Sequence, residues 1–397
     1  MIEHILRGLR VIDLTQNVAG PFCTQILGDM GADVLKVERP GSGDDTRAWL
    51  PPQIGGKSST FLALNRNKQS ICIDLDQPEG VAVLRKLAAR ADIVVHSFKP
   101  GSAESRGFGW DDLRQDKADL VYCAISAFGQ AGPLRQMPGY DPLMQAFTGI
   151  MSVTGNPNDD PVRVPVSLID MGTGLWAALG IVGAVLHRMR SGQGMDVRAS
   201  LMDTGLSWMT VFVASYLASG KLPQKMGSAM AMTAPYELFK AADGSVFIAA
   251  GNDRLFAKVC EALGCAQLAS DPRFATNTDR LTHRADLHEL MERQTQTLSC
   301  ADAVQRLRKT GAPCSELNDI GQVLRHEQVI ASQMVTDLPV EGAAQHQVIA
   351  LPLTANGQRS SRMDAPPLLG ADTDQVLRDH GYDEVAIAQL RRSAVVA

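Results

Sequence analysis

Residues 9–38, LRVIDLTQNVAGPFCTQILGDMGADVLKVE, contain the pattern from which the fold class follows. The runs 9–14 and 33–37 are rich in branched apolar residues and predict strands, and residues 20–30 have the apolar spacing of a helix. Both runs are apolar over most of their length, which indicates strands covered on both faces. A strand, a helix and a further strand in this order predict a parallel sheet.

The same alternation continues through the first half of the chain. Further strands are predicted at residues 70–75, 92–98, 120–126 and 194–201, and helices at 78–90 and 171–190. Pro78 suits a first helical position, where its missing N–H would have no partner. Basic residues followed by Ser191-Gly192 end the long apolar helix. The fold class is therefore α/β, with a doubly wound, Rossmann-like sheet.

The composition changes after Tyr216, where LASGKLPQKMGSAMAMTAP is rich in Gly, Pro, Ser and Met. We interpret residues 217–235 as a linker between a large first part, 1–216, and a smaller unit, 236–325. Residues 326–397 form a return linker and a tail that contains the strand-like QVIALPL. A chain of 397 residues is long enough for about two or three units of this size.

Charge and composition exclude several classes of function. The chain has 38 Lys and Arg against 43 Asp and Glu, a net charge of −5, so it lacks the basic stripe of nucleic-acid-binding proteins. The 7 scattered cysteines predict reduced thiols in the cytoplasm, and no Cys/His set predicts a metal site. We expect no membrane association, because no signal peptide and no uncharged apolar run of roughly 18 residues is present. Dinucleotide, P-loop and GxSxG motifs are absent.

Two local patterns leave a structural and a functional interpretation open. Ala19-Gly20-Pro21 suits close approach of a ligand to bare N–H groups, but it is also typical of an ordinary strand-to-helix turn. Asp170 lies where an apolar loop meets the long helix, and this pattern alone favours a helix N-cap. The alternative is a carboxylate nucleophile that attacks an activated acyl carbon. Asp203 has the same placement, so position does not choose between them.

A series of longer motifs runs through nearly the whole chain in order. They include LRGLRVIDLTQNVAGPFCTQILGDMGADVLKVERPGSGDDTR, LNRNKQSICIDL, ADIVVHSFKPGSAESRGFGWDDL, SAFGQAGPLRQMPGYDPLMQAFTG, PVSLIDMGTG, PYELFKAADGSVFIAAGND, GAPCSELNDI and PPLLG. Together they closely resemble the family III CoA-transferases, which include formyl-CoA transferase, carnitine CoA-transferase and α-methylacyl-CoA racemase.

The resemblance implies a covalent mechanism at Asp170. This carboxylate would attack the donor thioester to form a mixed anhydride, and CoA would return to form an aspartyl-CoA thioester. An acceptor carboxylate would then displace CoA, which finally takes the new acyl group. Each step needs oxyanion donors, which we expect from backbone N–H groups near Asn17 and Val18. Acyl-CoA is thus a substrate, and no tightly bound cofactor is expected.

The resemblance also implies where CoA binds, along the first strand-to-helix turns. The implied positions are Asn17, Val18, Ala19, Arg39, Ile73, Asp74, Leu75, Ser97, Phe98, Lys99 and Arg106. Arg39 is expected to pair with the nucleotide phosphates through its guanidinium fork. Ser97 stands where the family commonly has Asn, and Ser105 where it often has Arg, so Arg106 or Lys99 would supply that charge. For each basic residue a solvated surface charge is the structural alternative.

For the acceptor pocket we assign Arg47, Tyr140, Gly251 and Asn252. The racemase branch has a His at the position of Tyr140, and a tyrosine is a poor base, so a transferase is favoured over a racemase. Gly251-Asn252-Asp253 replaces the glycine run of formyl-CoA transferase and resembles the branch that transfers CoA from succinyl-CoA to dicarboxylates. An α-methylacyl-CoA racemase and a non-catalytic CoA-binding protein are the alternatives.

The resemblance finally implies an architecture and an assembly. The large domain would combine residues 1–216 with the C-terminal tail around a small central α+β domain, and two chains would form an interlocked homodimer. The expected partners are acyl-CoA and a small carboxylic acid, without nucleic acid or membrane.

Overall fold

Six parallel strands form the central sheet in the computed structural model, which describes residues 1–397. In chain order they are β1 (Arg10–Leu14), β2 (Asp33–Glu38), β5 (Lys68–Cys72), β6 (Ile93–His96), β7 (Val121–Ser126) and β8 (Met195–Ser200). Their spatial order is β5-β2-β1-β6-β7-β8, so the order reverses between β1 and β6. This is the doubly wound order of the Rossmann fold. The predicted parallel α/β sheet is confirmed.

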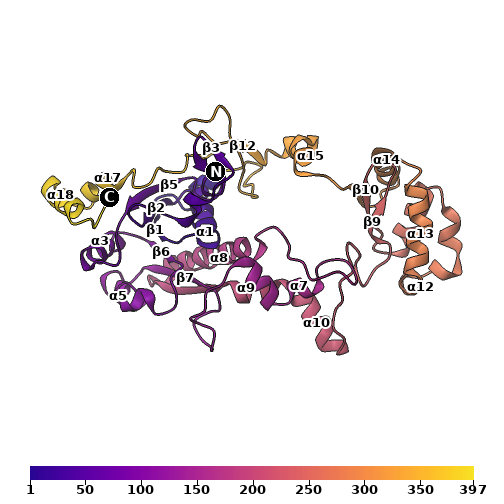
Figure 1. The fold of residues 1–397 in the computed structure, drawn as a ribbon, viewed down its shortest axis with the longest axis horizontal. Coiled ribbons are helices and arrows are strands. Elements are labelled where there is room, and N and C mark those ends of the chain that lie inside the picture. Colours follow the sequence, from indigo (N-terminus) through magenta and orange to yellow (C-terminus); the bar gives the residue numbers. More distant parts are fainter. The chain divides into compact units, whose positions relative to one another are not determined.

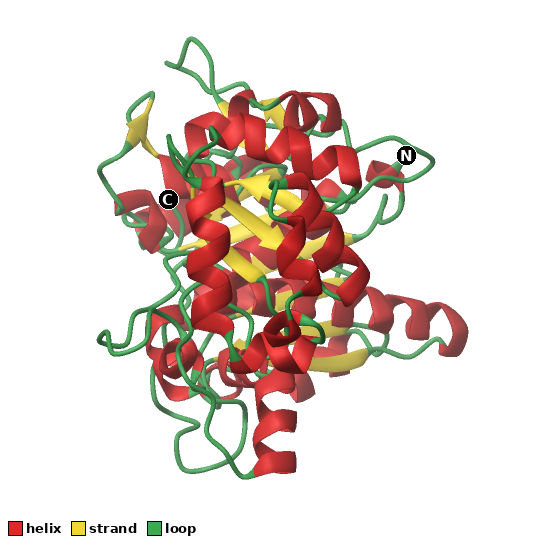
Figure 2. Ribbon diagram, turned by 90° about the vertical axis from the view of Figure 1, so that its right-hand side faces the viewer, coloured by secondary structure: helices red, strands yellow, loops and turns green.

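Helices cover both faces of this sheet (Figures 1 and 2). Helices α1 (Ala19–Asp29) and α8 (Leu168–Ser191) pack against each other on one face. The other face packs against α3 (Pro78–Ala88), α5 (Trp110–Asp116), α17 (Thr373–Asp379) and α18 (Glu384–Arg392). Every residue of β6 and β7 is buried as a result, which explains why these strands read as continuous apolar runs.

Close packing of α1 on α8 depends on Gly174. A Cβ atom at this position would lie 2.4 Å from the carbonyl oxygen of Ala19. By length and composition α8 would suit a membrane span, contrary to the expectation that no segment would. Half of its most apolar window is nevertheless buried within the protein, as in the core helix of a soluble protein.

The chain divides into two compact units. Unit 1 comprises Met1–Ile150, Arg163–Ala218 and Gln328–Ala397. The C-terminal tail joins this unit because the Asp74 N–H donates to the Val395 carbonyl at 2.8 Å and Ile73 forms a β-bridge with Val396. Its other strands and α-helices include β3 (Gln53–Ile54), β4 (Lys57–Ser58), α2 (Ser59–Leu64), α4 (Ser102–Ser105), α6 (Asp141–Phe147), α9 (Leu201–Trp208), β12 (Val335–Asp337) and β13 (Gln347–Ile349).

Unit 2 comprises Met151–Val162 and Ser219–Glu327, so it also takes a segment from within residues 1–216. An antiparallel sheet of β9 (Tyr236–Lys240), β10 (Ser245–Ala249) and β11 (Cys314–Glu316) forms its centre. Its helices are α11 (Asp253–Ala262), α12 (Asn277–Thr282), α13 (Arg284–Thr295), α14 (Cys300–Thr310) and α15 (Ile320–Arg325). Helices α7 (Ile150–Val153), α10 (Thr210–Ser219) and α16 (Glu327–Ser332) lie at the boundaries between the two units.

Candidate active site

Two adjoining cavities lie in unit 1 beside the loops that follow β1 and β6, where the strand order reverses. Ligands of open α/β sheets bind at this point, outside the carboxyl ends of the strands. The larger cavity has a volume of about 690 Å³ and the smaller about 220 Å³. Both are lined by Gln16, Asn17 and residues 97–100, so the two cavities form one continuous site.

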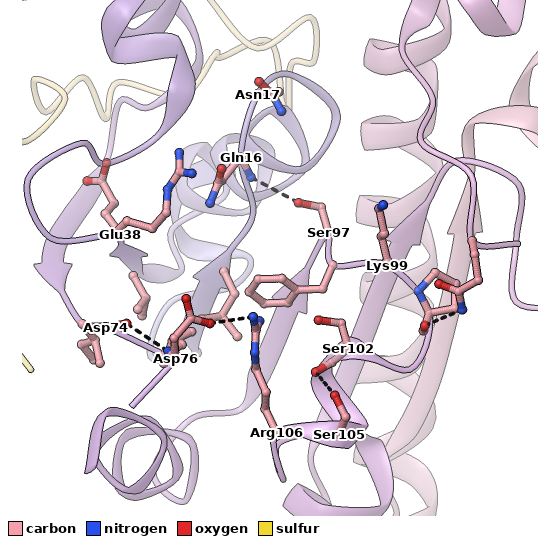
Figure 3. Close-up of a pocket in the computed structure, with 18 residues that line it drawn as sticks. Gln16, Asn17, Glu38, Asp74, Asp76, Ser97, Lys99, Ser102, Ser105 and Arg106 are labelled. Atoms are coloured by element: carbon pink, nitrogen blue, oxygen red, sulfur yellow. Dashed lines mark hydrogen bonds and ion pairs between the residues drawn. The ribbon is translucent and has the colours of Figure 1, made fainter. Parts of the chain in front are cut away.

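The larger cavity brings together most of the positions assigned to CoA (Figure 3). It is lined by Asn17, Arg39, Ile73, Asp74, Leu75, Ser97, Phe98, Lys99 and Arg106. Val18 and Ala19 line the smaller cavity instead. The turns after β1, β2, β5 and β6 therefore converge on one groove, because the carboxyl ends of parallel strands meet at one edge of a sheet.

Two arginines of the larger cavity already have partners. Arg39 donates to the carbonyl of Gly43 at 3.1 and 3.2 Å and pairs with Asp45. Arg106 pairs with Asp76 at 2.7 Å (Figure 3). These side chains are partly exposed, and exposed ion pairs contribute only about 0–1 kcal/mol, so a phosphate group can replace either carboxylate.

The loop before α1 differs in detail from what we expected. Asn17 adopts a left-handed conformation with φ of 66°, and its N–H donates to Asp44 Oδ1 at 3.2 Å. This N–H group is therefore not free to stabilise an oxyanion. Val18 is the N-cap residue of α1 and Ala19 its first residue, and the first N–H groups of a helix have no intrahelical partner. The backbone donors that remain for an oxyanion are thus those of Val18 and Ala19.

Packing within the protein, and not only the approach of a ligand, requires glycine at position 20. A Cβ atom at this position would lie 2.2 Å from the Cβ atom of Thr15. The turn from β1 into α1 consequently needs glycine here for packing, which is the structural interpretation of Ala19-Gly20-Pro21. The same turn nevertheless lines the smaller cavity.

A fully buried cluster of charges, which was not predicted from the sequence, supports this loop. Lys36 pairs with Asp44 at 2.8 Å and donates to the Thr15 carbonyl at 2.9 Å, and Lys68 pairs with Asp13 at 3.1 Å. Burial alone would raise the pKa of Asp13, but Lys68 and Lys36 lower it to about 2. Asp44 also accepts the N–H of Asn17, so the charge cluster is hydrogen-bonded to the loop that follows β1. Lys36 stands among the apolar residues of β2, and this was the feature of the sequence that indicated a buried charge.

Asp170 lines the smaller cavity as the third residue of α8. The helix is capped by another residue: Asp141 Oδ2 accepts the N–H groups of Ile169 at 2.7 Å and Asp170 at 3.1 Å. The interpretation of Asp170 as the N-cap is therefore wrong. Neither backbone nor side-chain groups donate a hydrogen bond to its carboxylate. Burial, and secondarily the charge of Asp141, raise the pKa of Asp170 to about 7.

Asp203, which has the same placement in the sequence, is already engaged. It is the third residue of α9, and its Oδ2 accepts the hydroxyl of Ser200 at 2.6 Å while the Ser200 hydroxyl accepts its N–H at 3.0 Å. The structure thus distinguishes a carboxylate committed to a helix terminus from one left available in a cavity.

The residues assigned to the acceptor pocket are not all brought together. Tyr140 lines the smaller cavity with 61% of its surface exposed. Arg47 lines neither cavity, because its guanidinium holds Glu38 at 2.7 and 2.8 Å and stacks on Phe61.

Gly251 and Asn252 belong to unit 2, where the Asn252 side chain caps α11 by accepting the N–H of Leu255 at 2.9 Å. Arg47 thus has intramolecular partners in this structure, and roles of Arg47, Gly251 and Asn252 in substrate binding stay predictions.

Several residues that line the smaller cavity were not predicted from the sequence, among them Trp49, Ser126 and Arg135. Trp49 and Arg135 lie in loops without periodic apolar spacing, and Ser126 ends the apolar run of β7. No local pattern separates them from ordinary loop residues, so only their shared cavity identifies them.

Comparison with known proteins shows the family of the chain. The profile of CoA-transferase family III matches residues 6–373. The chain is 34% identical over 392 residues to succinyl-CoA:glutarate CoA-transferase of Homo sapiens, covering 98% of this chain and 90% of that protein. It is 36% identical over 381 residues to succinate–glutarate CoA-transferase of Agrobacterium fabrum, covering 94% and 95% of the two chains.

Among solved structures, a CAIB/BAIF family protein from Brucella suis superposes with a TM-score of 0.84 at 35% identity, covering 94% of this chain and 99% of that one. Profile, relatives and fold agree with the motifs over nearly the whole length. The chain therefore belongs to CoA-transferase family III.

Proposed function

We propose that this enzyme transfers CoA from succinyl-CoA to a dicarboxylic acid, with Asp170 as the nucleophile. The observation that carries the proposal is the unbonded Asp170 carboxylate in a small cavity that opens into the larger groove. The groove suits the CoA nucleotide, and the cavity suits a short acyl group. The relatives named for succinyl-CoA and glutarate support this choice of substrates.

The chemistry needs no external proton, oxidant or metal. An Asp170 oxygen attacks the thioester carbon, CoA thiolate leaves, and a mixed anhydride forms. The thiolate then attacks the acyl carbon of Asp170, which releases the donor acid as a carboxylate and leaves an aspartyl-CoA thioester. The acceptor repeats these two steps in reverse, and the Asp170 carboxylate is regenerated. Each tetrahedral oxyanion lies in the cavity lined by Val18 and Ala19, whose N–H groups are the proposed donors.

The raised pKa of Asp170 fits this role. An ordinary aspartate is a weak nucleophile because water solvates it strongly, whereas burial leaves this carboxylate more basic. With a pKa of about 7, roughly half of the enzyme carries an ionised Asp170 at neutral pH.

Chemical trapping tests the proposal. The protein is incubated with succinyl-CoA, treated with hydroxylamine, and the modified residue is mapped by mass spectrometry. We expect a hydroxamate at Asp170 in the wild type and none in Asp170→Ala, while Asp203→Asn is the matched control and should still be labelled. Transfer activity that survives in Asp170→Ala would contradict the covalent mechanism. Exchange of an α-proton on a 2-methylacyl-CoA without any acceptor acid would instead indicate a racemase.

We also propose that two chains assemble into a homodimer. Several large apolar side chains on two helices are exposed, with exposed fractions of 59% for Leu179 and 78% for Met189 on α8, and 76% for Leu217 on α10. Helix α10 buries none of its residues despite its apolar sequence. Exposed apolar surface of this kind marks an interface. Sedimentation equilibrium tests the proposal, and a monomer at micromolar concentration would refute it; the interlocked form and the cytoplasmic location stay predictions.

A further inference from the structure

The smaller cavity contains two basic side chains that have no acidic partner. Its charged lining residues are Lys99, Arg135 and Asp170. The Arg135 side chain is exposed and forms no hydrogen bond or ion pair within the protein, whereas Arg39 and Arg106 of the larger cavity are paired with aspartates. An unpaired cation that shares a cavity with the proposed nucleophile is placed to bind an anionic part of the substrate.

Arg135 and Lys99 occupy different parts of the site. Lys99 lines both cavities and so lies at the passage between them, whereas Arg135 lines the smaller cavity alone. The loop that carries Arg135 is tied to the Lys99 loop, because the Gln136 side chain donates to the Pro100 carbonyl at 2.9 Å. Arg135 thus lines the smaller cavity only, whereas its neighbour Gln136 lines the larger one.

A dicarboxylic substrate places a specific demand on a small cavity. One carboxyl group must reach Asp170, and the other enters the same space of about 220 Å³ with its negative charge. A desolvated carboxylate needs a cationic partner, and a guanidinium binds it through two parallel hydrogen bonds. A monocarboxylic acid of the same length makes no such demand.

We propose that Arg135 binds the carboxylate of the acyl group that is not joined to CoA, and thereby selects dicarboxylic over monocarboxylic acids. The inference rests on the proposed function of Asp170 and deepens it. Because the succinyl group and the acceptor occupy this space in turn, the same guanidinium serves both half-reactions.

Steady-state kinetics with two acceptors of equal length tests the assignment. The acceptors are glutarate and pentanoate, with succinyl-CoA as donor, and the variants are Arg135→Gln, Arg135→Lys and the exposed control Arg7→Gln. In a ping-pong reaction the kcat/KM of the acceptor reports only on its reaction with the aspartyl-CoA enzyme. We expect Arg135→Gln to lower kcat/KM for glutarate about 10- to 100-fold, with a smaller loss in Arg135→Lys. The kcat/KM for pentanoate and the Kd of free CoA should not change.

The outcomes separate this inference from the one on which it rests. A wild-type protein that transfers CoA to none of these acids, and shows no adduct at Asp170, refutes the proposed function. Wild-type transfer to glutarate that is unaffected by Arg135→Gln refutes the role of Arg135 alone. A loss of CoA affinity as large as the loss of kcat/KM would assign Arg135 to CoA and also overturn the inference.

Discussion

Replacing Asp170 by Asn is expected to stabilise the folded protein at alkaline pH while it abolishes CoA transfer. Burial raises the pKa of this carboxyl from 3.8 to about 7, so the folded state prefers the protonated form. A group with a higher pKa in the folded than in the unfolded state binds more protons when folded. Stability is therefore lost as the pH rises from about 4 through about 7. Asparagine has the shape of the protonated acid and does not ionise.

The size of the effect follows from the two pKa values. The interval from 3.8 to about 7 corresponds to about 4 kcal/mol at 1.36 kcal/mol per pH unit. This is an upper value, because solvent reaches part of the half-buried carboxylate. Between pH 5 and pH 8 the advantage of Asp170→Asn over the wild type should grow by about 3 kcal/mol. For a chain of 397 residues this corresponds to a shift of about 3 °C in Tm.

Differential scanning calorimetry of the wild type and Asp170→Asn at pH 5 and pH 8 measures this change. Asp203→Asn is the matched control, because Asp203 is also the third residue of its helix but accepts the Ser200 hydroxyl at 2.6 Å. We expect no such gain in the control. A difference in Tm between Asp170→Asn and the wild type that is the same at both pH values would refute the reasoning.

Three further predictions follow from other contacts. The kcat/KM for succinyl-CoA should rise with pH and level off above about 7, because only ionised Asp170 attacks the thioester, and a flat profile from pH 5.5 to 8.5 would contradict this. Gly174→Ala should lower the free energy of unfolding by about 1–3 kcal/mol in urea titrations, since its Cβ atom would meet the Ala19 carbonyl oxygen at 2.4 Å. Gly183→Ala in the same helix has open space around its Cβ atom and should stabilise by up to about 1 kcal/mol; equal effects of the two substitutions would show that packing is not the cause. Lys36→Met should cost about 3–5 kcal/mol by the same measurement, because it leaves Asp44 buried without its cation, and a neutral result would remove the charge cluster as a support of the loop.

Much of the fold could be predicted because its signals are local. The strands β1, β2, β5, β6 and β7 follow from apolar runs, whereas β8 has the mixed sequence MDVRAS. The parallel pairing follows from the helices between the strands. The groove was predicted through motifs in the turns after the strands, which the resemblance had assigned to CoA. What the sequence did not predict are contacts that join distant residues.

Helix capping at the proposed nucleophile is one such contact. Asp141 caps α8 by accepting the N–H of Asp170, although the two residues are 29 positions apart in the sequence. The local pattern could therefore assign capping to Asp170 itself. Arg47 is a second case, since its partners are Glu38 in β2 and the carbonyl of Pro367, 320 residues away. The local sequence around an arginine does not show whether it has such distant partners or is free to bind a ligand.

The sequence by itself determined the α/β class, the parallel sheet, the family and the aspartate on which the chemistry is proposed to depend. The fold class and the parallel sheet follow from hydrophobic periodicity, which burial on both faces of a sheet imposes along the chain. The family and the proposed role of Asp170 follow instead from the resemblance of the motifs to family III CoA-transferases. Only the tertiary structure decided which charged side chains are engaged in contacts within the protein and which remain available to a substrate. Arg47 and Asp203 are engaged, whereas Arg135 and Asp170 share a cavity without such partners. Pairing and desolvation depend on distances across the fold, and those distances are set only when the strands assemble.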